Sequence, residues 1–272
     1  MAVGGSQMKT ISSRHNAVVR AFRELARTPD PTGARLLLDG VHLIRDAHAA
    51  GVDMDVVALD STRSRSAGEE ADVARALDAR GTRVLTVSAQ AFAAMSPVRA
   101  PSGIVAIARR RPVDAREVCG RGDALVLVVA DVQDPGNLGS LIRAGEAGGA
   151  SGVLVCGTSA SPFSWKAVRG SMGSILRLPV AAGLTVDIAI SCMRKHGGRI
   201  VSAAARGGRA PDTVDWRGRV ALLLGGEGSG LSAQALAHSD ELVTIPMAPP
   251  VESLNVAVAA AILVYAARRQ RL

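Results

Sequence analysis

Two uninterrupted apolar runs in the second half of the chain place the strongest constraint on its fold. They cover residues 124–130 and 220–224, and neither contains a polar side chain. A strand with only apolar residues has no face left for water, so it belongs in a parallel sheet that is covered on both sides. Strand-like and helix-like segments alternate between and around these runs. We therefore expect the second half to be an α/β domain.

The first half of the chain alternates in the same way on a smaller scale. A small α/β domain with a largely parallel sheet is expected there. Its expected strands are residues 35–39, 56–60, 83–87 and 103–108, and its expected helices are 14–27, 41–50, 70–79 and 89–95. The whole chain then divides into a disordered start at 1–9, a small domain at 10–112, a linker at 113–122 and a second domain at 123–272.

The balance of charge favours an anionic partner. The net charge is +8 and the pI is about 10.5. Only six residues are aromatic, so a protein that stacks single-stranded bases on aromatic platforms is not expected, whereas arginine–phosphate contacts are. Arg20 and Arg23 lie on the expected first helix, away from Val18, Phe22 and Leu25. They are candidate RNA-binding residues, and the competing interpretation is an ordinary solvated helix face.

Cysteine usage and hydropathy narrow the setting. Cys119, Cys156 and Cys192 are odd in number and far apart, and the histidines show no metal-ligand spacing. We expect no disulfide framework, no metal site and a reducing cytoplasm. The longest apolar run, Val256–Ala267, is too short for the ~20 residues that span a membrane. No apolar signal segment opens the chain, so a cytoplasmic protein without a membrane partner is predicted.

Three stretches of the second half combine strand ends, glycines and polar helix starts. In the last of them, a short strand at 242–245 is stopped by Pro246, and a polar loop then leads to an Ala-rich helix. Ser253 is the expected N-cap of that helix, whereas Asn255 has no clear helical role. The simplest alternative is a surface turn before a capped helix.

The Gly-rich turn at residues 225–230 follows an apolar strand directly, so its backbone N–H groups are available to a ligand. No Lys-Ser/Thr pair follows, and the glycine spacing differs from the dinucleotide-binding fingerprint. Glu227 suits a cation or an amine better than a phosphate. A tight strand-to-helix turn without a ligand explains the same residues.

In the loop at residues 131–137, Asn137 is a candidate cap for the helix that follows. Arg143 lies almost two turns farther along that helix, and small residues around it allow another backbone to approach closely. Considered alone, Arg143 is an ordinary surface arginine.

Together these stretches resemble a known family. Asp134-PGNLGSLIRAGEAGGA, Leu222-LLGGEGSGLS and Ile245-PMAPPVESLNVAVAAAI are similar, in order and spacing, to the three motifs of the SpoU/TrmH family. These proteins are RNA ribose 2′-O-methyltransferases of the knotted SPOUT superfamily. Residues 166–180 also look like the family, and residues 10–110 look like its attached substrate-binding domain.

The resemblance implies methyl transfer from S-adenosylmethionine to a ribose 2′-hydroxyl, a trefoil knot that holds the cofactor, and a homodimer formed through the C-terminal domain. Arg143 and Asn137 match the catalytic positions, and Arg143, Arg169, Arg20 and Arg23 are the expected RNA-binding residues. The cofactor-binding positions implied are Gly225, Glu227, Ile245, Met247, Ser253, Leu254 and Asn255.

The chemistry of Arg143 limits its role. A guanidinium stays protonated in proteins, so a simple proton acceptor is a poor description. We expect it to hold the target phosphate and ribose and to stabilise negative charge on the 2′-oxygen. The sequence departs from the family pattern at Ala144, at Pro249-Pro250 and at Ala257, positions where the family favours Thr or Ser, Gly, and Ser.

The attached first domain favours ribosomal RNA over transfer RNA as the substrate. A transfer RNA ribose 2′-O-methyltransferase is one alternative. A non-catalytic RNA-binding or ribosome assembly factor is another, although the retained motif residues argue against it. The sequence does not identify the target nucleotide. It also does not distinguish a housekeeping role from a role in antibiotic resistance.

Overall fold

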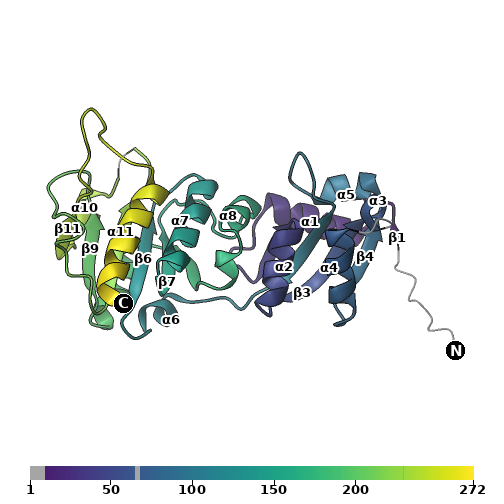
Figure 1. Cartoon of the computed structure of the whole chain (residues 1–272), viewed down its shortest axis with the longest axis horizontal. Helices are drawn as coiled ribbons and strands as arrows, with labels where there is room; N and C mark the ends of the chain where they lie inside the picture. The colour runs from purple at the N-terminus through teal and green to yellow at the C-terminus, as the bar shows by residue number, and fades with distance from the viewer. Residues whose placement is uncertain (1–9, 65–67, 229) are drawn as a thin grey trace. The chain divides into compact units, whose positions relative to one another are not determined.

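A computed structural model describes residues 10–64, 68–228 and 230–272 of the chain (Figure 1). The disordered start expected at residues 1–9 lies outside the described residues. The chain divides into two compact units, of which the first ends at Arg111 and also takes in residues 163–165. The second consists of Pro112–Pro162 and Lys166–Leu272.

The first unit is a five-stranded sheet with helices, in the strand order β1-β4-β3-β5-β2. The expectation of a largely parallel sheet is wrong for one strand, because β5 runs antiparallel to both β2 and β3. Its elements are β1 (Thr10–Ile11), α1 (Ala17–Arg27), β2 (Arg35–Asp39), α2 (Val41–Ala49), β3 (Asp53–Asp60), α3 (Ser61–Ser64), α4 (Glu69–Asp78), β4 (Val84–Val87), α5 (Ala89–Met95) and β5 (Ile104–Arg109).

The first helix starts later than its sequence suggests. Asn16 is the N-cap of α1, and its side chain accepts a hydrogen bond from the backbone N–H of Val18. Val19, not Val18, joins Phe22 and Leu25 in the core. The fully buried rings of Phe22 and Phe92 are the largest side chains of this core.

The second unit is built on a six-stranded sheet in which every pair of neighbouring strands is parallel, in the order β11-β9-β10-β6-β7-β8. Its elements are α6 (Ala115–Cys119), β6 (Leu125–Ala130), α7 (Pro135–Ala147), β7 (Gly152–Cys156), α8 (Trp165–Gly170), the 3₁₀-helix η1 (Ser174–Leu176), β8 (Val180–Leu184), α9 (Val186–Lys195), β9 (Arg199–Ala203), β10 (Val220–Gly225), α10 (Ala233–Ala237), β11 (Glu241–Val243) and α11 (Val256–Arg271).

Both faces of this sheet are covered, which explains the apolar runs. On one face, Val126 and Val128 belong to a core with residues of α6 and α9. On the other face, α7 and α11 pack against each other (Figure 1). A Cβ added at Gly148 would lie 2.0 Å from the side chain of Val264. The continuous apolar strands predicted from the sequence are confirmed, because both faces of each strand are buried.

The expected linker at 113–122 contains a helix. Asp114 caps α6 by accepting a hydrogen bond from the backbone N–H of Glu117 at 2.8 Å. Val118 and Cys119 are fully buried in the core of the second unit. These residues therefore form part of that unit, and the linker interpretation is wrong for them.

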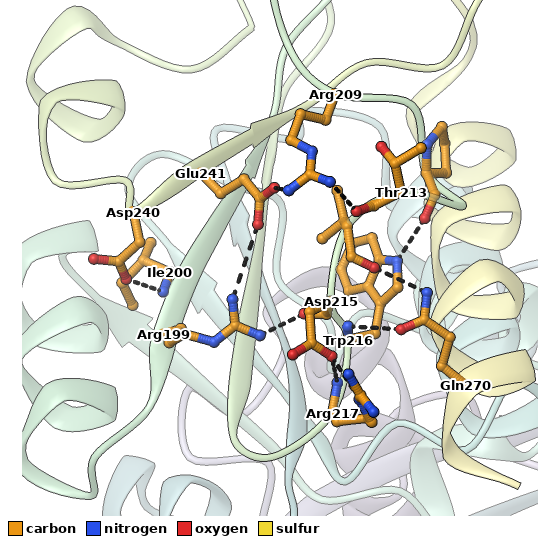
Figure 2. Close-up of polar contacts among 12 residues, drawn as sticks. Arg199, Ile200, Arg209, Thr213, Asp215, Trp216, Arg217, Asp240, Glu241 and Gln270 are labelled. Carbon is orange, nitrogen blue, oxygen red and sulfur yellow. Dashed lines mark hydrogen bonds and ion pairs between the residues drawn. The ribbon is translucent and has the colours of Figure 1, made fainter.

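The amino ends of β9, β10 and β11 carry a dense polar network (Figure 2). Arg209 and Arg199 both approach the carboxylate of Glu241, and Trp216 is fully buried beside them. Gln270 of α11 accepts from the backbone N–H of Trp216 at 3.0 Å and donates to the carbonyl of Val214 at 2.9 Å. The network thus ties the last turn of α11 to the loop that precedes β10.

Across the described residues, no helix has both the length and the apolar character that a membrane crossing requires.

Candidate active site

A cavity of about 520 Å³ opens at the carboxyl ends of β9, β10 and β11. In parallel α/β sheets this is the edge at which ligands bind. Its wall is mostly apolar side chains and backbone, and the volume falls in the usual range for a site that holds a small molecule. It is lined by Ala203, Ala204, Ala205, Leu224, Gly225, Gly226, Glu227, Gly228, Gly230, Leu231, Leu236, Val243, Ile245, Met247, Ser253, Leu254, Asn255, Val256, Ala259 and Leu263.

Glycine is required where the turn after β10 meets other backbone. A Cβ on Gly225 would lie 2.2 Å from the carbonyl carbon of Gly230, and one on Gly226 would lie 1.9 Å from the backbone oxygen of Asp131. Neither position has room for a side chain. The turn is therefore held against the loop after β6, and this contact brings the first two motif regions together.

A chain of side-chain hydrogen bonds then joins all three motif regions. Asn137 donates through Nδ2 to Oε1 of Glu227 at 2.7 Å. Its own Oδ1 accepts from Nδ2 of Asn255 at 2.9 Å. Glu227 and Asn255, which lie 90 and 118 positions after Asn137 in the sequence, thus both bond to the side-chain amide of Asn137.

The donor-to-acceptor direction of these side-chain hydrogen bonds is set at the start of α11. Oδ1 of Asn255 accepts from the backbone N–H groups of Ala257 at 2.9 Å and Val258 at 3.3 Å. Asn255 is the N-cap of α11, so the expectation that Ser253 caps this helix is wrong. Because its oxygen is engaged there, the NH₂ group of Asn255 faces Asn137.

The first motif's helix also differs from expectation at its cap. Asp134, not Asn137, is the N-cap of α7, and it accepts from the backbone N–H of Asn137 at 2.8 Å. The side chain of Asn137 is free for the contacts with Glu227 and Asn255. In the third motif region, β11 ends at Val243 and not at Ile245 as expected, which leaves Ile245 and Met247 in the cavity wall.

Glu227 is held as a carboxylate. Burial acts to raise its pKa, but the hydrogen bond from Asn137 and backbone N–H donors, including that of Gln133 at 3.3 Å, outweigh it. The pKa of Glu227 therefore lies below its usual value, and the group is ionised at neutral pH.

The structure brings together most of the residues that the sequence singled out. All seven expected cofactor-binding residues line the cavity, and Asn137 contacts two of them. Arg143 is exposed on α7 and does not line the cavity. Arg169, Arg20 and Arg23 are also exposed and also lie outside that lining.

Sequence reasoning missed two contributors. Gln133 donates its backbone N–H to Glu227 and its side chain to Thr158, which braces the loop after β6. Residues 203–205 form one wall of the cavity. The sequence feature that could have located residues 203–205 is their position at the carboxyl end of an expected strand. In the described residues, no group of three or more His, Cys, Asp or Glu side chains is placed to hold a metal ion.

Comparison with known proteins identifies the family. A model of the SpoU rRNA Methylase family matches residues 124–265, more than half of the chain. The chain belongs to the SpoU rRNA methylase family. All three motif regions that meet at the cavity lie within the matched residues.

Proteins named as RNA methyltransferases match the chain over nearly its full length. An uncharacterised tRNA/rRNA methyltransferase of Synechocystis sp. is 31% identical over 98% of this chain and 96% of its own. The 23S rRNA (guanosine(2553)-2′-O)-methyltransferase RlmP of Bacillus subtilis is 30% identical over 95% of this chain and 98% of its own. The crystal structure of an AdoMet-bound rRNA methyltransferase from Sinorhizobium meliloti matches with a TM-score of 0.83 at 29% identity, covering 98% of this chain and 100% of that one.

Proposed function

We propose that this chain is an S-adenosylmethionine-dependent RNA methyltransferase that methylates a ribose 2′-hydroxyl in ribosomal RNA. The observation that carries the proposal is the series of hydrogen bonds from Asn255 to Asn137 and from Asn137 to Glu227. These bonds join the three SpoU motif regions at the cavity. The SpoU relatives cover the first unit as well as the second, and one of them is named as a 23S rRNA 2′-O-methyltransferase.

The cavity suits the cofactor chemically. Its apolar wall, which includes Leu231, Ile245 and Met247, suits an adenine ring, and the glycine turn leaves backbone groups accessible. We assign backbone contacts to Gly225, Ile245 and Leu254, and side-chain contacts to Glu227, Met247 and Ser253. When bound, the cofactor supplies an electrophilic methyl group on a sulfonium.

Arg143 and Asn137 carry the chain's own part of the reaction in this proposal. Arg143 holds the target phosphate and ribose and stabilises negative charge as the 2′-oxygen attacks. Asn137 keeps Glu227 and the start of α11 in register, so that cofactor and ribose are presented in line. Family membership supports a trefoil knot around the C-terminal segment, as in SPOUT proteins.

A homodimer is part of the proposal. Val258, Ile262 and Tyr265 recur on one face of α11 and are between 39% and 49% exposed, an apolar stripe that a second copy would cover. The helix that carries this stripe, α11, packs against α7, which carries Arg143. An Ile262→Glu variant should sediment as a monomer where the wild type sediments as a dimer. A wild type that sediments as a monomer at micromolar concentration contradicts this assignment.

The first unit is proposed to bind RNA through phosphates. Arg20, Arg23 and Arg27 lie on one face of α1 at helical spacing, and none forms an ion pair with a described residue. Arg169 would add a contact from α8. The double variant Arg20→Gln/Arg23→Gln should reduce the slope of log affinity against log salt by about 2. An unchanged slope would mean that this face is only solvated.

The three buried free cysteines support a reducing cytoplasmic setting.

The test is methyl transfer by the purified full-length chain. Unmodified 23S rRNA and tRNA transcripts are incubated with methyl-labelled S-adenosylmethionine, and digested nucleosides are analysed by mass spectrometry. We expect a 2′-O-methylnucleoside from 23S rRNA. Methylation of tRNA alone supports the transfer RNA alternative. Cofactor binding without transfer to either RNA indicates a non-catalytic assembly factor, and a methylated base contradicts the reaction class.

A further inference from the structure

The cofactor cavity carries a single fixed charge. Among the described residues that line it, Glu227 is the only one with a titratable side chain. The other polar side chains in the wall, Ser253 and Asn255, are neutral. Glu227 is therefore the carboxylate nearest to any ligand in the cavity, and Asp134, whose negative charge acts on Glu227 from outside the lining, adds to the same sign of field.

This carboxylate is held in place by a directed set of donors. The N–H groups at the start of α11 donate to Asn255, Asn255 donates to Asn137, and Asn137 donates to Glu227. Turning either amide over would set NH₂ groups against N–H donors, so only one arrangement satisfies every group. A second donor, the backbone N–H of Gln133, reaches Oε2 of Glu227. The charge on Glu227 is thus a built feature of the site.

Asn137 and the backbone N–H of Gln133 each donate to one oxygen of this carboxylate, which has about four acceptor positions. The side chain is exposed at the wall of the cavity, so the remaining oxygen lone pairs are accessible to a ligand. Such a group attracts a cationic centre more strongly than a neutral centre of the same shape.

We propose that Glu227 makes the cavity selective for the positively charged form of its ligand, the sulfonium of S-adenosylmethionine, over the neutral thioether S-adenosylhomocysteine that remains after methyl transfer. This inference rests on the proposed function and adds a specificity-determining residue to it. Loss of the positive charge in the reaction then removes the attraction, so the product leaves a site whose negative charge is no longer balanced.

The test compares three ligands by calorimetric titration of the full-length chain, without RNA. S-adenosylmethionine carries a sulfonium, sinefungin carries an ammonium near the same position, and S-adenosylhomocysteine is neutral there. Glu227→Gln keeps the shape and an acceptor for Asn137 but removes the charge. We expect this variant to bind both charged ligands about tenfold more weakly and S-adenosylhomocysteine within about twofold of wild type.

Two further variants sharpen the comparison. Glu227→Asp keeps the charge and should retain most of the preference for charged ligands. Glu252→Gln is the matched control, because Glu252 is a highly exposed carboxylate that pairs with Arg206 at 3.0 Å and does not line the cavity. It should leave all three affinities unchanged.

The outcomes are distinguishable. Equal weakening of all three ligands in Glu227→Gln overturns the inference, because the residue would then shape the pocket instead of reading charge. Unchanged affinities in that variant also overturn it. A wild-type chain that binds none of the ligands contradicts the proposed function itself, and the inference with it.

Discussion

The two ends of the six-stranded sheet in the second unit use polar residues in opposite ways. At the carboxyl end, the glycine turn packs closely against other backbone, and the side chain of Asn137 and the backbone N–H of Gln133 donate to one carboxylate, Glu227. At the amino end, arginines and Gln270 form hydrogen bonds and ion pairs with carbonyls and carboxylates of the protein itself (Figure 2). One end is organised to receive a ligand, and the other is closed on itself.

Arg271 shows the character of the amino end most clearly. It donates to the carbonyls of Trp216 and Asp123, each at 2.7 Å, and also to that of Gly218. Burial lowers the pKa of this guanidinium, but an arginine remains charged at neutral pH. We expect stability and ligand binding to depend on different residues of the second unit. Substitutions at each end should therefore have separable effects.

The largest expected effect is at the amino end. Trp216→Ala removes a fully buried indole that also donates to the carbonyl of Pro211 at 2.7 Å. The free energy of unfolding of the second unit should fall by about 3–5 kcal/mol. Urea unfolding followed by circular dichroism measures it. Cofactor affinity of the protein that remains folded should stay at the wild-type value, and Trp216→Phe should lose less stability. If Trp216→Ala lowered cofactor affinity without lowering the free energy of unfolding, the two ends would not have separate roles.

On α7, the helix that starts from the carboxyl end of the sheet, Arg143→Ala should lower kcat by roughly 10²–10³, the usual cost of losing one donor to a developing oxyanion. Arg143 is exposed, so melting temperature and cofactor affinity should stay near wild type. Arg143→Lys should restore little, because an ammonium lacks the planar two-pronged geometry. Single-turnover methylation across a pH series is the measurement.

Two results would redirect that assignment. If the rate of Arg143→Ala climbs with pH until it approaches wild type, hydroxide is replacing a missing base, and Arg143 acts as a proton acceptor. If the Ala variant is fully active, Arg143 is only a structural residue of α7.

The smallest effect sharpens the comparison within the carboxyl end. Asn137→Ala leaves Glu227 without its 2.7 Å donor and Asn255 without its acceptor. Cofactor affinity should fall by about tenfold, or ~1.4 kcal/mol, because Glu227 and the start of α11 lose the side chain that holds them in register. Calorimetry gives the affinity, and thermal unfolding should change little. Ser140→Ala, an exposed position on the same helix, is the control and should change neither quantity.

Much of the second unit could be predicted because its apolar runs and its glycine turn leave few alternatives. The caps could not. Ser253 and Asn255 are both good N-caps by type, and the choice depends on Asn137, which lies 118 residues earlier. The same long-range contact explains why Asn137 does not cap α7, where Asp134 takes that place.

In the first unit, periodicity located β5 but could not give its direction, because a buried strand has the same pattern in either orientation. The short helix α6 was hidden in a stretch rich in charge and glycine, and its buried Val118 and Cys119 are too few to show a period. Arg143 was found by motif resemblance alone, and its exposed position gives no second local signal.

We propose that this chain methylates ribose 2′-hydroxyls in ribosomal RNA, with Arg143 at the reaction. The most direct measurement maps 2′-O-methyl positions in ribosomal RNA from cells that contain the gene, cells that lack it, and deletion cells that carry either the wild-type chain or Arg143→Ala. We predict a 2′-O-methyl position that disappears on deletion and returns with the wild-type chain but not with the variant. A ribosomal RNA methylation map identical in all four would contradict the account.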